Sequence, residues 1–218
     1  MRITITDDSE LSPDALDLPW SSRNETGVGA VARSLGTKTH IRVVASAKSW
    51  LCHAGVDRRG AILPTGAPEE VEKISPLQAS VLYLEHLRNA WNHAHPDAKM
   101  DAQQVVITVP ASFDPAAREL TAEAARLAGY KNLVLLEEPQ AALYSWIQRS
   151  AGQWREQVNV GDVILVVDVG GGTTDLSLIA VLENEGHLEL HRVAVGARVT
   201  VVLVSLVVFG LSMLMLLS

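Results

Sequence analysis

Three consecutive glycines directly after a β-branched run are the feature that most constrains the fold of this 218-residue chain. The run Val163–Val167 predicts a buried strand that delivers Asp168 at its C-terminal end. A second apolar run, Leu176–Leu182, follows too soon for a crossover helix to fit between them. The pattern therefore predicts a strand, a glycine hairpin and a second strand.

This hairpin has the composition of a phosphate-binding turn. Gly170, Gly171 and Gly172 permit positive φ and let backbone N–H groups approach a ligand. Successive N–H groups in such a turn form a concave site for an anion. Asp168 is suited to hold Mg²⁺ through its water shell, and Thr173 adds a hydroxyl group. An ordinary tight hairpin is the alternative, whereas a Walker A loop and a dinucleotide fingerprint are excluded by the missing Gly-Lys-Ser/Thr and G-x-G-x-x-G patterns.

Composition excludes several other classes of protein. The net charge of −7 and the absence of a basic stripe argue against nucleic acid as a partner. Cys52 is the only cysteine, so the chain has neither a disulfide framework nor a thiolate metal site. The N-terminus has no apolar signal core, and we therefore expect a cytoplasmic protein.

The C-terminal segment departs from this pattern. Val199–Leu217 has no charged residue, and about 18 apolar residues are enough to span a bilayer as a helix. The segment is therefore a candidate apolar helix within the tail of residues 197–218. Two interpretations remain open: a membrane anchor, which would make a membrane the partner, or the translated remnant of a reading frame broken near Gly196.

Alternating helix and strand signals place the chain in the mixed α/β class. Ser75-Pro76 and Asp114-Pro115 each have the pattern of a helix start, with a capping residue before a proline. The first of these helices has an amphipathic stripe of apolar residues, namely Leu77, Val81, Leu84, Leu87 and Trp91. The other expected elements are helices at 28–35, 116–128 and 140–153, and strands at 41–45, 105–109, 133–136 and 188–195.

Five segments occur in an order that carries a family resemblance: 106–113, Arg118, 124–129, 137–142 and 168–175. This order resembles the ATPase domain of the seventy-kilodalton heat-shock chaperones (DnaK-like), in a divergent bacterial branch. The resemblance runs from about Val43 to Gly196. It implies a partial actin-like, ribonuclease-H-like α/β fold. Residues 1–158 would be part of lobe I, 159–196 the start of lobe II, and 197–218 the apolar tail.

The resemblance also implies roles for individual residues. It implies phosphate binding for the turn and the residue after it: Gly170, Gly171, Gly172, Thr173 and Thr174. Asp168 corresponds to the carboxylate associated with Mg²⁺, and Glu138 to the acid that positions the attacking water and the metal. Lys48 corresponds to the lysine that reaches the γ-phosphate. Pro110 and Arg118 correspond to the pair that relays the nucleotide state. The implied cofactors are ATP and Mg²⁺, with K⁺ as a further candidate.

Each of these residues also has a plainer interpretation. A lysine before Trp50 is commonly a solvated side chain, Pro110 a strand stop, and Arg118 a charge on a helix surface. Glu137, beside Glu138, is expected to face solvent. His93 and His95 have no metal-ligand partner in suitable spacing, so we expect both to be exposed.

The sequence departs from the family pattern at both ends. It contains no Asp-Leu-Gly-Thr-Thr run, which forms the family's first phosphate loop, and the resemblance stops after Val195-Gly196. The resemblance implies an ATP-hydrolysing chaperone whose partners are unfolded polypeptides and co-chaperones. We expect this chain to be an incomplete version with weak or no ATPase activity. The alternatives are a non-enzymatic actin-like scaffold, a sugar-kinase relative, for which no aspartate base is evident, and a tail-anchored pseudo-ATPase.

Overall fold

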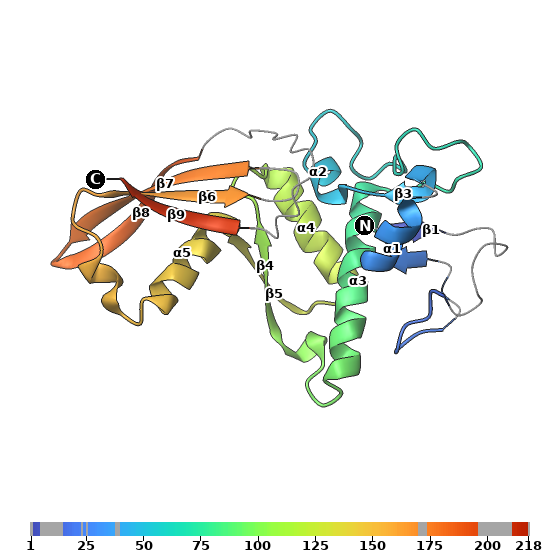
Figure 1. The fold of residues 1–218 in the computed structure, drawn as a ribbon, viewed down its shortest axis with the longest axis horizontal. Coiled ribbons are helices and arrows are strands. Elements are labelled where there is room, and N and C mark those ends of the chain that lie inside the picture. The colour runs from blue at the N-terminus through green and yellow to red at the C-terminus, as the bar shows by residue number, and fades with distance from the viewer. Residues whose placement is uncertain are drawn as a thin grey trace. The chain divides into compact units, whose positions relative to one another are not determined.

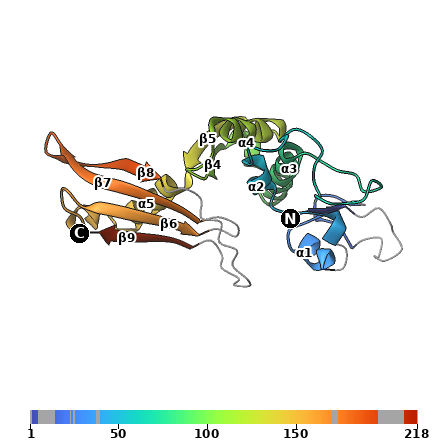
Figure 2. The ribbon, with the colours of Figure 1, turned by 90° about the horizontal axis from the view of Figure 1, so that it is seen from above.

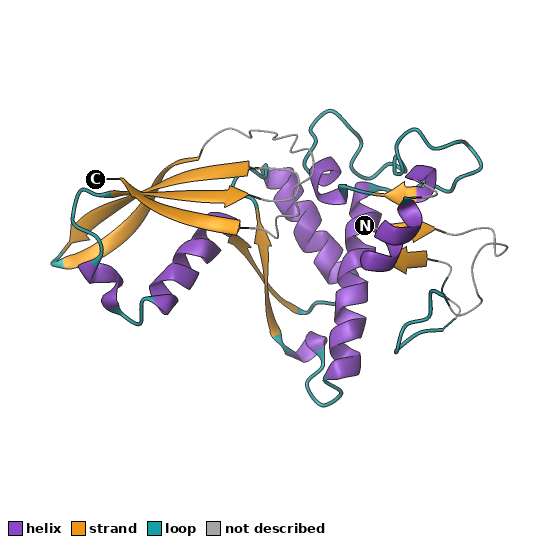
Figure 3. Ribbon diagram, viewed as in Figure 1, coloured by secondary structure: helices purple, strands orange, loops and turns teal. Residues whose placement is uncertain are grey.

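A computed structural model of the chain describes residues 2–4, 15–22, 24, 26–37, 40–169, 174–195 and 211–217. The chain divides into two compact units: unit 1 is Met1–Val105 with Asp114–Val134, and unit 2 is Val106–Phe113 with Leu135–Ser218. Figure 3 shows that helices predominate in unit 1 and strands in unit 2. Each unit has a hydrophobic core of its own.

Unit 1 combines a small sheet with four helices (Figure 1). The sheet has the order β2-β1-β3, and both pairings are antiparallel. Its elements are β1 (Arg2–Thr4), β2 (Thr26–Val28), α1 (Ala30–Gly36), β3 (Val43–Val44), α2 (Ala47–Leu51), α3 (Pro76–Ala94) and α4 (Pro115–Leu127). Helices α3 and α4 pack against each other.

The two long helices of unit 1 begin where the capping signals predict. The Ser75 side chain accepts a hydrogen bond from the Gln78 amide at 2.9 Å. Asp114 accepts one from the Ala117 amide at 2.6 Å, and a proline follows each cap. These bonds satisfy N–H groups that the first turn of a helix leaves without partners.

The amphipathic stripe of α3 is confirmed only in its first half. Leu77 and Val81 are buried, whereas Leu87 is 56% exposed, so its predicted burial is wrong. Farther along, polar contacts join α3 to the end of α4. The Arg88 side chain donates to the Ala128 carbonyl at 2.6 Å, and the Tyr130 hydroxyl donates to the Leu84 carbonyl at 2.9 Å.

Several predicted boundaries are wrong. The strand expected at 41–45 is reduced to β3, because residues His40–Arg42 form a 3₁₀ turn. The helix expected at 140–153 is α5, which spans Glu138–Arg149 and is followed by a 3₁₀ turn at Gln153–Glu156. Strands β4 (Gln104–Val109) and β5 (Asn132–Glu137) confirm the strands predicted at 105–109 and 133–136 and are neighbours in a two-stranded sheet.

Unit 2 is a four-stranded sheet covered on one face by α5 (Figures 1 and 2). The strand order is β8-β7-β6-β9. The strands are β6 (Val163–Val169), β7 (Thr174–Asn184), β8 (His187–Val195) and β9 (Leu211–Leu217). Alternate residues of β6 and β7 face the helix, and with residues of α5 and of the segment after it they form a core of Leu143, Trp154, Val158, Ile164, Val166, Ile179 and Val181.

The predicted hairpin is confirmed by the register of its strands. β6 and β7 are antiparallel, and Val169 opposite Thr174 is their last pair before the turn. The turn residues Gly170, Gly171, Gly172 and Thr173 lie outside the described residues. The next hairpin closes at Asn184 opposite His187, with φ of 50° at Glu185 and 79° at Gly186. Two successive residues with positive φ are typical of a type I′ turn, which matches the twist of the paired strands.

The helix expected at the C-terminus is wrong for the part of the tail that the structure describes. Residues 211–217 form β9, which pairs antiparallel with β6, from Leu211 opposite Val169 to Leu217 opposite Val163. Residues 196–210 lie outside the described residues. Of the helices among the described residues, none has the length and apolar character needed to cross a bilayer.

Candidate functional site

The structure places the predicted site residues in both units. Lys48 and Arg118 belong to unit 1, on α2 and α4. Pro110, Glu138, Asp168 and Thr174 belong to unit 2, where Pro110 follows β4 and Glu138 is the first residue of α5. The two groups are described separately below.

In unit 1, Lys48 is presented by the short helix α2. Ala47 and Leu51 are 3% exposed each and hold the helix against the core, whereas Lys48 is exposed. The residue before the helix, Ser46, has φ of 54° in the left-handed region and makes no side-chain cap. This conformation is uncommon for a residue other than glycine and is frequent at functional sites.

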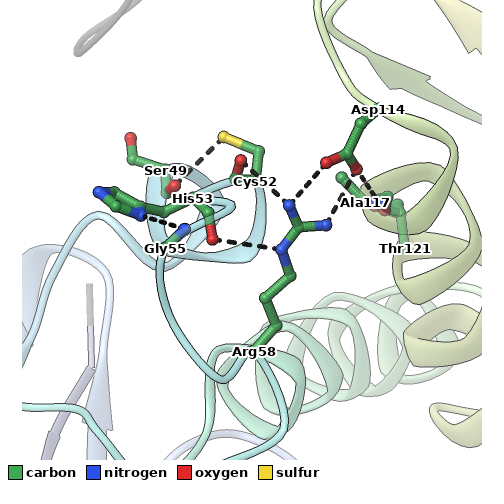
Figure 4. A network of polar contacts seen from close by, with 8 residues as sticks. All are labelled: Ser49, Cys52, His53, Gly55, Arg58, Asp114, Ala117 and Thr121. Atoms are coloured by element: carbon green, nitrogen blue, oxygen red, sulfur yellow. Dashed lines mark hydrogen bonds and ion pairs between the residues drawn. The ribbon is translucent and has the colours of Figure 1, made fainter.

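A network of polar contacts surrounds the C-terminal end of α2 (Figure 4). The two terminal nitrogens of Arg58 donate to the two carboxylate oxygens of Asp114 at 2.9 and 2.6 Å. Arg58 also donates to the carbonyls of Cys52 and His53, at 3.4 and 3.3 Å. The hydrogen bonds with Asp114 raise the pKa of the Arg58 guanidinium above its usual value, against the opposing effect of burial.

The environment of this ion pair is asymmetric. The Arg58 side chain is 11% exposed and the Asp114 side chain 42%. A cavity of about 330 Å³ borders the pair, and its wall includes Ala54, Val56 and Leu120. Solvent therefore reaches the pair mainly from the carboxylate side.

In unit 2, the inner face of the sheet becomes polar near the glycine turn. Asp168 and Asp175 are opposite each other in the register of β6 and β7. Asp175 is 2% exposed and Ser177 is fully buried. Neither Oδ1 of Asp175 nor Oγ of Ser177 has a hydrogen-bond partner among the described residues. A buried oxygen without a partner costs stability, so each of these atoms calls for an explanation, such as a ligand, an ion or a water that supplies the missing contact.

The chemistry of the two aspartate carboxyl groups suits a magnesium ion. Mg²⁺ takes oxygen ligands, retains several waters and needs only one or two carboxylates. Asp168 and Asp175 supply such oxygens from adjacent strands. Within the described part of the chain there is no cluster of three or more metal-ligating side chains, so an all-protein cage for a metal is not seen there.

The turn that carries Glu138 is tied to the sheet by an ion pair. Arg192 of β8 contacts the Glu137 carboxylate, whose side chain is only 15% exposed. The prediction that Glu137 faces solvent is therefore wrong. Leu188 and Leu190 pack against the core, and Arg192 follows them on the same face of β8. Glu138 itself lies in the first turn of α5, where the helix dipole favours a negative charge.

Sequence reasoning missed four residues of these two groups: Arg58, Asp114 as an ion-pair partner, Asp175 and Arg192. Asp175 closes the same glycine motif that Asp168 opens, so the motif contained its signal. Arg192 interrupts an alternating apolar pattern on β8, which also gave a signal. The partner of Arg58 is 56 residues away in the chain, and nothing in the local sequence points to it. The exposure expected for His93 and His95 is confirmed.

Comparison with known proteins decides the family. The family model described as Hsp70 protein matches residues 21–198. The chain belongs to the Hsp70 family. It is 36% identical over 177 residues to the chaperone protein HscA of Edwardsiella ictaluri, which covers 74% of this chain and 27% of that protein. It is 34% identical over 162 residues to the HscA homolog of Tolumonas auensis, covering 70% of this chain and 24% of the relative.

A DnaK relative gives the same family over a shorter stretch. The chaperone protein DnaK of Mycoplasmopsis agalactiae is 36% identical over 109 residues, which are 50% of this chain and 17% of that protein. The chain thus spans about a quarter or less of the length of these relatives.

Proposed function

We propose that this chain is a nucleotide-binding portion of an Hsp70-type ATPase domain, with Mg²⁺-ATP as its ligand. The observation that carries the proposal is the pairing of Asp168 with the buried Asp175 directly beside the glycine turn. A carboxylate pair next to a turn rich in backbone N–H groups suits a metal-bound polyphosphate. Membership in the Hsp70 family supports the same ligand.

The proposed roles divide between phosphate binding and positioning. Gly170, Gly171, Gly172, Thr173 and Thr174 would bind phosphate oxygens. Lys48 would place its ammonium group at the γ-phosphate, since phosphoryl transfer depends mainly on positioning and charge neutralisation. Glu138 would orient the attacking water. Pro110 and Arg118 would relay the state of the nucleotide.

Asp168 and Asp175 would hold the Mg²⁺ ion, which neutralises charge on the phosphates when it is bound. The carboxylate of Asp168 would act through the water shell of the ion. Asp175 is paired with Asp168 of β6, and the pairing of β7 with β8 begins two residues later, at Ser177. K⁺ is a further candidate for the same oxygen ligands.

We further propose that these 218 residues alone bind ATP weakly and hydrolyse it negligibly. They contain no Asp-Leu-Gly-Thr-Thr run, the family's first phosphate loop. Each charge-assisted hydrogen bond to phosphate that is not made costs roughly 1.5–3 kcal/mol. Residues 1–158 would then contribute to lobe I and 159–196 to lobe II. A cytoplasmic location, unfolded polypeptide clients and co-chaperones follow from the family as proposals.

The test is a titration of the 218-residue chain with Mg²⁺-ATP, followed by NMR or amide hydrogen exchange. We expect a saturable response at residues 46–50 and 168–177, with a dissociation constant near the millimolar range. Asp168→Asn should abolish the response, and Mg²⁺-AMP, which lacks the β- and γ-phosphates, should not reproduce it. A wild-type chain without a localised response would overturn the proposal. Micromolar binding would contradict the predicted weak affinity but not the proposal that the chain binds Mg²⁺-ATP.

A further inference from the structure

Helix α2 is too short to orient Lys48 by itself. It spans five residues, Ala47–Leu51, and isolated helices of this length are unstable in water. Its N-terminal side begins at Ser46 in the left-handed region and has no side-chain cap. Ala47 and Leu51 pack α2 against the core, and the direction in which α2 presents Lys48 depends in addition on contacts at its C-terminal side.

Arg58 supplies those contacts. Its guanidinium donates to the Cys52 and His53 carbonyls, which immediately follow α2 and have no further helical turn to bond with (Figure 4). The same guanidinium is held by both oxygens of Asp114, at 2.6 and 2.9 Å. A planar fork of this kind fixes orientation as well as distance.

Asp114 connects this arrangement to a second helix. It caps α4 by accepting a hydrogen bond from the Ala117 amide at 2.6 Å. Arg58 thus joins the C-terminal end of α2 to the N-terminal end of α4, within unit 1. Arg118 lies one turn into α4. The ion pair of Arg58 and Asp114 therefore links the helix that carries Lys48 to the helix that carries Arg118.

We infer that Arg58 is a positioning residue for Lys48: its bonds to Asp114 and to the carbonyls after α2 set the direction in which Lys48 meets the phosphates. The inference rests on the proposed function, because only that function gives Lys48 a phosphate to meet. Arg58 itself does not contact the nucleotide in this proposal.

The chain offers a matched control in the next residue. Arg59 also pairs with a carboxylate of α4, Glu123, at 2.7 and 2.5 Å. Its side chain is 59% exposed, and its guanidinium donates to Glu123 rather than to the carbonyls after α2. Arg59→Gln therefore removes an ion pair between the same loop and the same helix without removing the contacts to α2.

The first measurement is amide hydrogen exchange without nucleotide. The informative amides are those of Trp50 and His53, which donate to the carbonyls of Ser46 and Trp50. We expect Arg58→Gln to speed their exchange about tenfold, the effect of losing a charge-assisted bond, while the Ala79 amide of α3 is unchanged. Arg59→Gln should leave all three amides unchanged. Equal effects of the two variants would overturn the inference.

The second measurement is a double-mutant cycle of Mg²⁺-ATP affinity with Lys48→Ala and Arg58→Gln. If Arg58 acts through Lys48, the double variant binds no more weakly than Lys48→Ala, and the losses are non-additive. A purely structural role for Arg58 would make them additive and would overturn the inference while leaving the proposed function intact. Absence of any wild-type response to Mg²⁺-ATP would instead overturn the proposed function.

A second substitution covers the case in which Arg58→Gln does not fold. Arg58→Lys keeps the positive charge beside Asp114 but cannot form the planar fork. We expect it to give the same faster exchange at Trp50 and His53 to a smaller extent, and the same non-additivity with Lys48→Ala. Wild-type behaviour of Arg58→Lys in both measurements would show that charge alone suffices and that the fork does not position α2.

Discussion

Asp175 and Ser177 are polar residues buried on a strand whose next two inner positions, Ile179 and Val181, belong to the apolar core. Oδ1 of Asp175 and Oγ of Ser177 lack protein partners among the described residues, and such atoms lower stability unless something else satisfies them. These two buried polar residues are expected to lower the free energy of unfolding of unit 2. Residues that lower stability are commonly retained because they contribute to function.

The first prediction follows for Asp175→Asn. The asparagine amide supplies a hydrogen-bond donor as well as an acceptor, and it replaces the buried carboxylate with an uncharged group. We expect the unfolding midpoint of the unliganded protein to stay equal or rise, while the response to Mg²⁺-ATP falls at least tenfold, a loss of about 1.4 kcal/mol. Ser177→Ala is the control: stability should rise slightly and the nucleotide response should persist. A loss of stability in Asp175→Asn with undiminished binding would contradict the prediction.

A second residue-scale prediction concerns His86. It lies edge-on to Trp20, with ring centroids 5.4 Å apart, and the ring of His93 is 5.9 Å from the same tryptophan. Burial lowers the pKa of His86. Between the lowered folded pKa and the unfolded value near 6.5, the unfolded state binds more protons, so stability falls as the pH falls.

The measurement is the urea midpoint at about pH 7.5 and about pH 5.5 for the wild type and for His86→Gln. The wild type should lose more stability on acidification than the variant, because the variant has no imidazole to protonate at this position. Identical losses in the two proteins would show that the His86 contact with Trp20 does not contribute to the pH dependence.

At the scale of elements, local signals predicted the starts of the helices α3 and α4 and the positions of the strands β4, β5 and β8. α3 and α4 begin at their predicted caps, because a Ser or Asp side chain followed by proline determines a helix start within a few residues. The C-terminal helix was wrong over residues 211–217 for a different reason, whereas the 41–45 strand was wrong only in its bounds. An apolar run states that a segment is buried or in a membrane, but only long-range pairing decides between strand and helix.

Strand β9 shows this limit most clearly and leads to the third prediction. Adjacent N–H groups of a strand point to opposite sides, so only one of Ser212 and Met213 can donate to β6. Ser212→Pro and Met213→Pro should therefore differ: one loses a ladder bond and about 1–3 kcal/mol of unfolding free energy, and the other is tolerated at the edge of the described sheet. Urea unfolding of both variants measures the difference. Equal losses would indicate a helix over residues 211–217 rather than β9.

At the scale of the whole molecule, the resemblance in sequence reached further than any local pattern. The order of short motifs predicted the family, which the match over residues 21–198 shows. The resemblance did not predict the ion pairs of the candidate site. Arg58 and Asp114 are 56 positions apart in the chain, and Glu137 and Arg192 are 55 positions apart. Motifs record residue types and spacing, whereas ion pairs across a fold depend on how elements pack.

The last prediction uses the assignment of the proposed ligand residues to both units. Lys48 and Arg118 belong to unit 1, and Glu138 and Asp168 belong to unit 2. A ligand that contacts residues of each unit only when both are folded must stabilise both, by RT ln(1 + [L]/Kd), or about 1.4 kcal/mol at ten times the dissociation constant. Amide hydrogen exchange with Mg²⁺-ATP at that ratio should therefore slow in the cores around Leu63 and around Val166. Lys48→Ala should reduce the effect in unit 1 more than in unit 2. Protection confined to unit 2 in the wild type would show that Lys48 does not contact the nucleotide in this chain, and that the phosphate turn binds it alone.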